Sequence, residues 1–190
     1  MQIIVDFGLD GQGYVDLVRD KGVGELAIPD WALECPWCPD RHRLTRHGSY
    51  GRYATSKEAA DRTRILRLLC KARGQTVSLL PQCLAPKKQH TFEVIGVYYE
   101  GRLVGLSQQA AMERATRVNP SRQKGAYWEQ CLIGGRAKAE AYLGSGRRES
   151  SSSGPMASYI RHLKRGFKSL GDALAFHDRR IRERLGVWLL

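Results

Sequence analysis

The N-terminal half of the chain alternates short apolar runs with turn residues, a pattern typical of strands and tight loops. MQIIVDF predicts an opening strand, and Tyr14–Gly22 predicts a short helix that ends at its glycine. ELAIPDWALECPWC is expected to be extended. A strand is then predicted to run into Cys70, and another over Thr76–Leu80, where Pro81 stops it.

After Pro86 the apolar period changes from 2 to 3.6. Phe92, Ile95, Tyr99 and Leu103 recur at i, i+3, i+7 and i+11. This spacing places the four side chains on one face of a helix.

Further helices are predicted toward the C-terminus. Ser107 is a suitable N-cap for one helix, and Pro120 with Ser121 begins another. Gly134-Gly135 is expected to end that helix, and an Ala-rich third follows over Arg136–Leu143.

These patterns predict an α+β protein with four segments. Residues 1–86 form a small β domain, and residues 87–143 are helical. GSGRRESSSSGP, residues 144–155, has the composition of a linker, and residues 156–190 form a basic amphipathic tail. The tail repeats apolar residues at helical spacing: Leu163, Phe167, Leu170, Leu174, Ile181 and Trp188.

Charge adds information about partners. The 190 residues include 31 Lys and Arg but only 19 Asp and Glu, which gives a net charge of +12. Such an excess favours a polyanion, because neutralising phosphates releases condensed counterions. A merely soluble basic protein is the alternative interpretation.

The first residues lack the basic and long apolar regions of a signal peptide, and no window approaches 18 apolar residues. We therefore expect no membrane partner and a cytoplasmic, nucleoid-associated location. In that setting the five cysteines indicate thiols or metal ligands rather than disulfides.

The cysteine spacing predicts half of a structural zinc site. Cys35 and Cys38 form a C-x-x-C knuckle, and about 30 residues later Cys70 is followed by Arg73 at the place of a fourth cysteine. An arginine cannot ligate a metal. Strand, knuckle, strand, second turn and strand is the order of a zinc ribbon, here a degenerate one.

The fourth ligand has several candidates. His42, four residues past Cys38, is our predicted ligand, with His47 as the other histidine and Cys83 as a more distant thiol. In a further alternative the ribbon has lost its metal and persists through packing.

Residues 107–132 have the spacing of a helix-turn-helix. The turn would lie around residues 118–120, and Tyr127 or Trp128 would anchor the second helix. Gly125 costs about 1 kcal/mol relative to alanine inside a helix, so this helix is expected to begin late or be short. The alternative is a helical hairpin whose polar face is only solvated.

Arg and Gln can pair with base edges, and Lys with phosphate, from the first turn of such a helix. A second set of basic and aromatic residues follows the knuckle. The predicted DNA contacts are Arg46, Tyr50, Arg52, Arg117, Ser121, Arg122, Gln123 and Lys124.

The order of these motifs resembles a bacterial transposon-associated zinc-ribbon and helix-turn-helix family of unknown function. This family is related to the DNA-binding front ends of insertion-sequence transposases. The resemblance covers Met1–Leu132 and rests on IIVDFGLDGQGYVDLV, CPWC, RHGSYGRY, RILRLLCKARGQTVSLLP, FEVIGVYYEGRLVGLS and PSRQKGAYWEQ. It implies sequence-directed DNA binding in a mobile element, with zinc held by two C-x-x-C pairs. The chain departs from the family at Arg73, and at Gly125 and Ala126 in the recognition helix.

Catalysis is not expected. The acids of the basic half lie in helical stretches, which leaves no sheet for an acidic metal-binding triad, and no phosphate-binding Gly-rich loop is present. We expect a DNA-binding accessory or regulatory protein that positions a transposase or recombinase. Its protein partner would be that enzyme or another copy of itself, and no small-molecule substrate is expected. The alternative is a protein-interaction adaptor with only non-specific nucleic-acid affinity.

Overall fold

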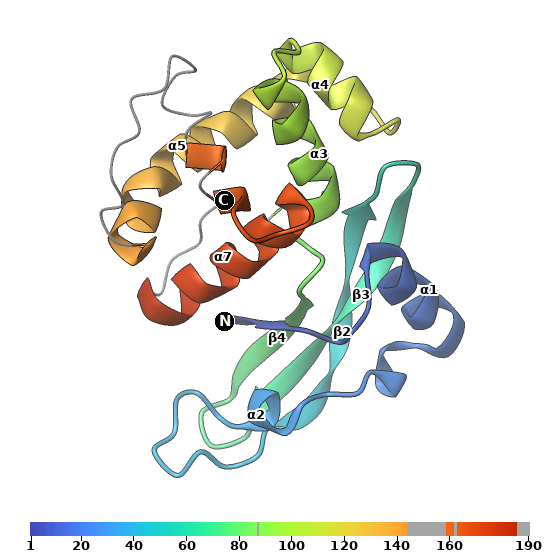
Figure 1. Cartoon of the computed structure of the whole chain (residues 1–190). Coiled ribbons are helices and arrows are strands. Elements are labelled where there is room, and N and C mark those ends of the chain that lie inside the picture. Colours follow the sequence, from blue (N-terminus) through green and yellow to red (C-terminus); the bar gives the residue numbers. More distant parts are fainter. Residues whose placement is uncertain (87, 144–158, 162, 186–190) are drawn as a thin grey trace. The chain divides into compact units, whose positions relative to one another are not determined.

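A computed structural model describes residues 1–86, 88–143, 159–161 and 163–185 (Figure 1). The chain divides into two compact units, which we call unit 1 (Met1–Ala54 and Ala60–Leu84) and unit 2 (Thr55–Ala59 and Ala85–Leu190). A four-stranded sheet and several helices make the fold class α+β, as predicted.

Unit 1 is built on the sheet. Its elements in chain order are β1 (Gln2–Val5), α1 (Gly11–Lys21), the 3-10 turn η1 (Val23–Glu25), α2 (Asp30–Leu33), β2 (Thr45–Thr55), β3 (Ala60–Cys70) and β4 (Gln75–Pro81). Helix α2 lies in a segment that was predicted to be extended, so that prediction was wrong there. Pro29 precedes the helix with φ −60°, and Asp30 places a carboxylate in its first turn, which favours helix initiation.

The strand order is β1-β4-β3-β2 (Figure 1). Strands β3 and β4 form an antiparallel hairpin, in which Cys70 pairs with Gln75. Strand β1 pairs with β4 in parallel, with Gln2 opposite Ser78. The first strand of the chain thus completes a sheet whose other members are made much later.

Helix α1 supplies the second layer of the core of unit 1. The Asp10 carboxylate caps the helix by accepting from the Gly13 N–H at 2.7 Å. The helix buries Tyr14, Val15 and Val18 in one cluster with the apolar side chains of β3 and β4. Helix α1 thus covers the sheet with apolar side chains.

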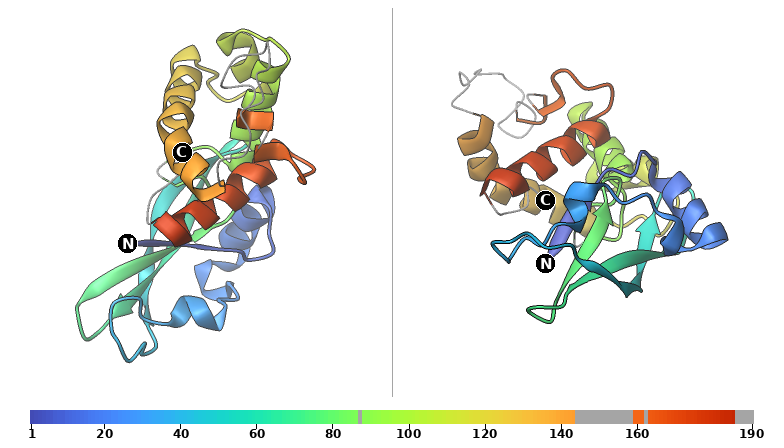
Figure 2. Two further views of the ribbon diagram at one scale, coloured as in Figure 1. Left: turned by 60° about the vertical axis from the view of Figure 1, so that its left-hand side comes forward. Right: turned by 90° about the horizontal axis from the view of Figure 1, so that it is seen from below.

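Unit 2 is mainly helical. Its elements are α3 (Phe92–Leu103), α4 (Gln108–Ala115), α5 (Arg122–Leu143) and α7 (Leu170–Leu185). Helix α3 packs against α4 and α7, and α5 packs against the same two helices (Figure 2). The Ser107 hydroxyl accepts from the Ala110 N–H at 3.1 Å, so the predicted N-cap of α4 is confirmed.

Helix α5 is continuous over 22 residues, which corrects two predictions. Gly134-Gly135 does not end it, and Gly125 does not delay its start. At Gly125 an added Cβ would lie 2.7 Å from the Tyr98 ring, so the glycine lets the helix approach that ring closely. Packing of α5 therefore overrides the low helix propensity of glycine.

The C-terminal segment also joins the core of unit 2. Leu163, Leu170 and Leu174 are buried there, in agreement with the predicted apolar stripe. Gly96 of α3 and Gly171 of α7 meet so closely that a Cβ on Gly96 would lie 2.4 Å from the Gly171 nitrogen. The predicted linker, residues 144–155, lies outside the described residues. Of the helices in the described part of the chain, none has the length and apolar character that crossing a bilayer requires.

Candidate metal centre and nucleic-acid interface

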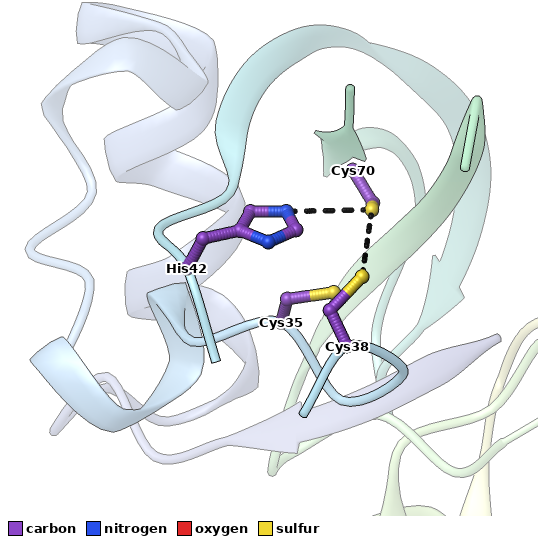
Figure 3. Close-up of side chains that lie close together, drawn as sticks. All are labelled: Cys35, Cys38, His42 and Cys70. Carbon is purple, nitrogen blue, oxygen red and sulfur yellow. Dashed lines mark hydrogen bonds between the residues drawn. The ribbon is translucent and has the colours of Figure 1, made fainter. Parts of the chain in front are cut away.

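Four metal-ligating side chains come together at one end of the sheet of unit 1. Cys35, Cys38, His42 and Cys70 present donor atoms that all lie within 4.8 Å of one another (Figure 3). The Cys38 and Cys70 sulfurs are 3.8 Å apart, and His42 Nε2 lies 3.4 Å from the Cys70 sulfur. The four residues are close enough to hold a metal ion.

Local backbone geometry brings three of these donors together within eight residues. The Cys35 N–H donates to the His42 carbonyl at 2.9 Å, which closes the loop on itself. Inside the loop the Arg41 N–H donates to the Cys38 carbonyl at 3.1 Å, and Arg41 adopts the left-handed φ of 45°. Cys70, the last residue of β3, supplies the fourth donor.

The surroundings favour the thiolate of Cys35 and disfavour that of Cys38. Burial of the Cys35 thiol opposes ionisation, but hydrogen bonds from the backbone of Trp37 and Cys38 outweigh it and lower the Cys35 pKa to about 7. Burial, together with the neighbouring Cys35 and Cys70 sulfurs, raises the Cys38 pKa to about 11. A cation at the centre would favour the thiolate form of every sulfur.

The donor set and its spacing fit zinc. Three cysteines and one histidine are a common set for structural zinc. Two sulfurs bound tetrahedrally to one zinc ion, each at about 2.3 Å, are separated by roughly 3.8 Å, the separation seen here between Cys38 and Cys70. The group also borders a cavity of about 420 Å³ that Cys35, Cys38 and Trp31 help to line.

The other ligand candidates lie outside the group. His47 is exposed on β2, and Arg73 lies in the exposed turn between β3 and β4. Burial raises the pKa of the Cys83 thiol to about 12, and Cys83 packs with the core of unit 1 instead. Of the open alternatives, His42 is the one that the geometry favours.

The predicted contacts on β2 are engaged within unit 1. The Arg46 guanidinium donates to the Gly24 carbonyl at 2.7 Å, and the Tyr50 hydroxyl accepts from the Gln2 amide at 3.4 Å. Arg52 is half-buried, and its burial lowers its pKa. Their side chains thus contribute to the packing of unit 1.

In unit 2, α4 and α5 are joined by the six residues 116–121. The Arg117 N–H donates to the Lys57 carbonyl at 2.8 Å, and its side chain pairs with Glu58 at 3.2 Å. The Ser121 carbonyl accepts from the Gly125 N–H in the first turn of α5. These contacts hold the turn between the two helices.

The outer face of α5 is polar near its start. Arg122 and Gln123 are exposed, and Lys124 is half-buried. Tyr127, which was predicted only as a possible anchor, and Gln130, which was not selected, are exposed one and two turns after Gln123. The i, i+4, i+7 spacing from Gln123 would have identified them. Trp128, not Tyr127, is the anchor: it is 3% exposed, whereas Tyr127 is 53% exposed.

A half-buried carboxylate holds α5 against its neighbours. Glu129 accepts from Tyr98 at 2.8 Å, Arg102 at 2.6 Å and Gln108 at 2.9 Å. Burial opposes ionisation of Glu129, but these donors, Arg102 first, lower its pKa. The network joins α3, α4 and α5 through one charged group, which sets the orientation of the exposed face.

The model of a domain family of unknown function, DUF6431, matches residues 35–117. No curated protein and no solved structure shows significant similarity to the chain. The matched region begins at Cys35, contains all four donors and ends after α4. The metal centre and the first two helices of unit 2 are thus the part that resembles this family.

Proposed function

We propose that the chain is a non-catalytic DNA-binding protein that uses α4 and α5 as a helix-turn-helix. The observation that carries this proposal is the exposed polar start of α5, supported on its inner side by the half-buried Glu129 network. A recognition helix needs base-reading side chains on its outer face and firm support on its inner face. Helix α5 has both.

In this proposal each residue has a defined role. Arg122 would pair with guanine and Gln123 with adenine, while Lys124 would contact phosphate. Gln130 and Tyr127 would extend the same face along the groove. The net charge of +12 supports a polyanionic partner.

The metal centre has a structural role in this proposal. The ion would be zinc, held by Cys35, Cys38, His42 and Cys70, and unit 1 would act as a ribbon-like module with a basic face. A four-ligand Cys₃His set leaves no coordination position open for a substrate, which is the character of a structural site.

The role in a mobile element rests on the sequence resemblance. The chain would position a transposase or recombinase, or a second copy of itself, on DNA. The alternative is an adaptor that recruits a protein and binds nucleic acid without preference. Sequence preference distinguishes the two proposals.

The test is selection of bound duplexes from a random library by the zinc-loaded full chain, followed by footprinting. We expect an enriched sequence whose footprint weakens in Arg122→Ala/Gln123→Ala/Lys124→Ala. A matched control that also removes two charges, Arg19→Ala/Lys21→Ala on α1, should keep the footprint. Steep salt-dependent binding without any enriched sequence would favour the adaptor instead.

A further inference from the structure

The outer face of the β2–β3 hairpin carries two arginines that sequence reasoning did not select. Along β3 the side chains alternate: Arg62 and Arg64 are exposed, whereas Thr63 and Ile65 are buried. Both arginines therefore extend from the face opposite the core.

Both guanidinium groups lie across the neighbouring strand β2. Arg64 Nε donates to the Ser49 hydroxyl at 2.8 Å. A Cβ added to Gly51 would lie 2.8 Å from Arg62 Nε, so the Arg62 guanidinium lies directly over that glycine. The small residues at positions 49 and 51 thus leave room for two cations side by side.

The spacing of these cations suits a phosphate chain. Alternate residues of a strand are about 6.6 Å apart, a separation close to that of consecutive phosphates along one nucleic-acid strand. Tyr53, 52% exposed, continues the same face of β2 two residues beyond Gly51. Its ring and hydroxyl can contact the sugar and phosphate groups next to the arginines.

The exposed positions of β2 and β3 carry no negative charge. These positions are Arg46, His47, Gly48, Gly51, Tyr53, Ala60, Arg62 and Arg64. In the described part of the chain neither Arg62 nor Arg64 forms an ion pair. Two uncompensated guanidinium groups in fixed positions favour an anionic partner.

We infer that Arg62, Arg64 and Tyr53 form a second DNA-contacting surface on unit 1. This surface binds the phosphate backbone of a duplex without reading its sequence. This inference rests on the proposed function and assigns the basic face of unit 1 to these residues. Arg46 and Tyr50 are instead hydrogen-bonded within unit 1, and Arg52 is half-buried. The surface supplies affinity, and α5 supplies sequence preference.

The test measures binding of the full chain to a random-sequence duplex over a range of salt concentrations. Each phosphate contact adds about 0.9 to the slope of log affinity against log salt, so Arg62→Ala/Arg64→Ala should reduce the slope by about 1.8. Lysine at both positions should restore most of the slope, because a point charge satisfies a phosphate. Arg19→Ala/Lys21→Ala is the charge-matched control.

The outcomes separate this inference from the function it rests on. A slope for Arg62→Ala/Arg64→Ala equal to that of the control would overturn the hairpin surface and leave α5 untouched. A reduced slope, together with an unchanged footprint in Arg122→Ala/Gln123→Ala/Lys124→Ala, would support the surface and contradict the role of α5. Thermal unfolding of each variant is the control for folding, and these exposed substitutions should leave the unfolding temperature unchanged.

Discussion

Asp40 determines which ring nitrogen of His42 faces the metal group. The Asp40 carboxylate lies 3.2 Å from His42 Nδ1, which leaves Nε2 directed at Cys70. The same hydrogen bond lowers the pKa of Asp40, so the carboxylate stays charged. A carboxylate behind a metal-binding imidazole fixes its tautomer and raises its basicity.

Replacing Asp40 with alanine should therefore weaken zinc binding by about 10- to 100-fold while all four ligands remain. Competition with a chromophoric chelator measures the affinity. Asp30→Ala, which removes an exposed carboxylate paired with Arg43, is the control and should bind zinc normally. An unchanged affinity in Asp40→Ala would mean that His42 needs no orientation.

His90 predicts a pH dependence of stability. Its ring is 4% exposed, and Nε2 has no hydrogen-bond partner among the described residues. Burial, with a contribution from Lys124, lowers its pKa from 6.5 to about 4. Between pH 6.5 and 4 the unfolded chain therefore binds a proton on His90 that the folded chain excludes. The stability that depends on neutral His90 is fully present above pH 6.5 and is lost as the pH falls toward 4.

Urea unfolding at pH 7 and pH 4.5 measures this loss. We expect the His90→Gln variant to lose less stability than the wild type between the two values, by on the order of 2 kcal/mol. Comparison of the two proteins cancels the carboxylates that titrate in the same range. Equal losses of stability in the two proteins would show that His90 has the same pKa in the folded and the unfolded chain.

At the residue scale, sequence reasoning identified the metal group because its spacing is local. Three donors lie within eight residues, so a short loop fixes their separation. The side chains of β2 were harder to assign, because Gly48 has φ 104° and interrupts the regular alternation of the strand.

Helix α5 shows how the surroundings of a glycine decide its effect. Gly125 lies against the fully buried Tyr98 ring, whereas Gly134, nine residues later, is exposed with no atom within 4 Å of an added Cβ. Helix propensity is equally unfavourable for glycine at the two positions. The packing around them differs, so substitution should have different effects.

Gly125→Ala and Gly134→Ala should accordingly change stability in opposite directions. At Gly125 the new methyl group overpacks the contact with Tyr98, whose hydroxyl is held by Glu129, and should cost about 1–3 kcal/mol. At Gly134 it should add roughly 0.5–1 kcal/mol of stability through helix propensity. Denaturant unfolding of both variants measures the difference, and stabilisation by both would argue against close packing on Tyr98.

At the element scale, helices with strong periodicity and a capping residue were predictable. The apolar spacing gave α3 its bounds, and Ser107 marked the start of α4. The break expected in α5 was wrong because it was inferred from the local sequence, and the contacts of α5 come from residues far away in the chain. The short α2 was missed because four residues carry too little periodicity.

At the scale of the whole molecule, each unit has its own hydrophobic core. One core contains Tyr14, Ile65 and Leu79, and the other contains Tyr99 and Leu132. The cysteines of the candidate metal centre belong to the core of unit 1. Loss of an ion should therefore affect one core more than the other.

A chelator should lower the unfolding temperature of unit 1 and leave that of unit 2 unchanged. Calorimetry of the zinc-loaded and chelated chain checks this, with two transitions expected after chelation. Cys70→Ser should reproduce the effect without chelator, and Cys131→Ser, outside the metal group, should not. One transition that shifts as a whole would mean that the units unfold together.

The assignment of residues to units could not be read from the sequence. Thr55–Ala59, the tip of the β2–β3 hairpin, belongs to unit 2, where Thr55 N–H donates to the Gln89 carbonyl at 2.6 Å. The pairing of β1 with β4 is equally long-range. No local pattern marks either contact, because both depend on segments that meet only after folding.

The distribution of the four donors along the chain has a consequence for biosynthesis. Cys35, Cys38 and His42 leave the ribosome together, whereas Cys70 follows His42 by 28 residues. At about 5–20 residues per second this interval lasts roughly 1 to 6 s. During that time a nascent chain offers an ion three ligands and one place for water, so the metal can still exchange. Completion of β3 would then add Cys70 as a fourth ligand and slow the exchange of a bound ion.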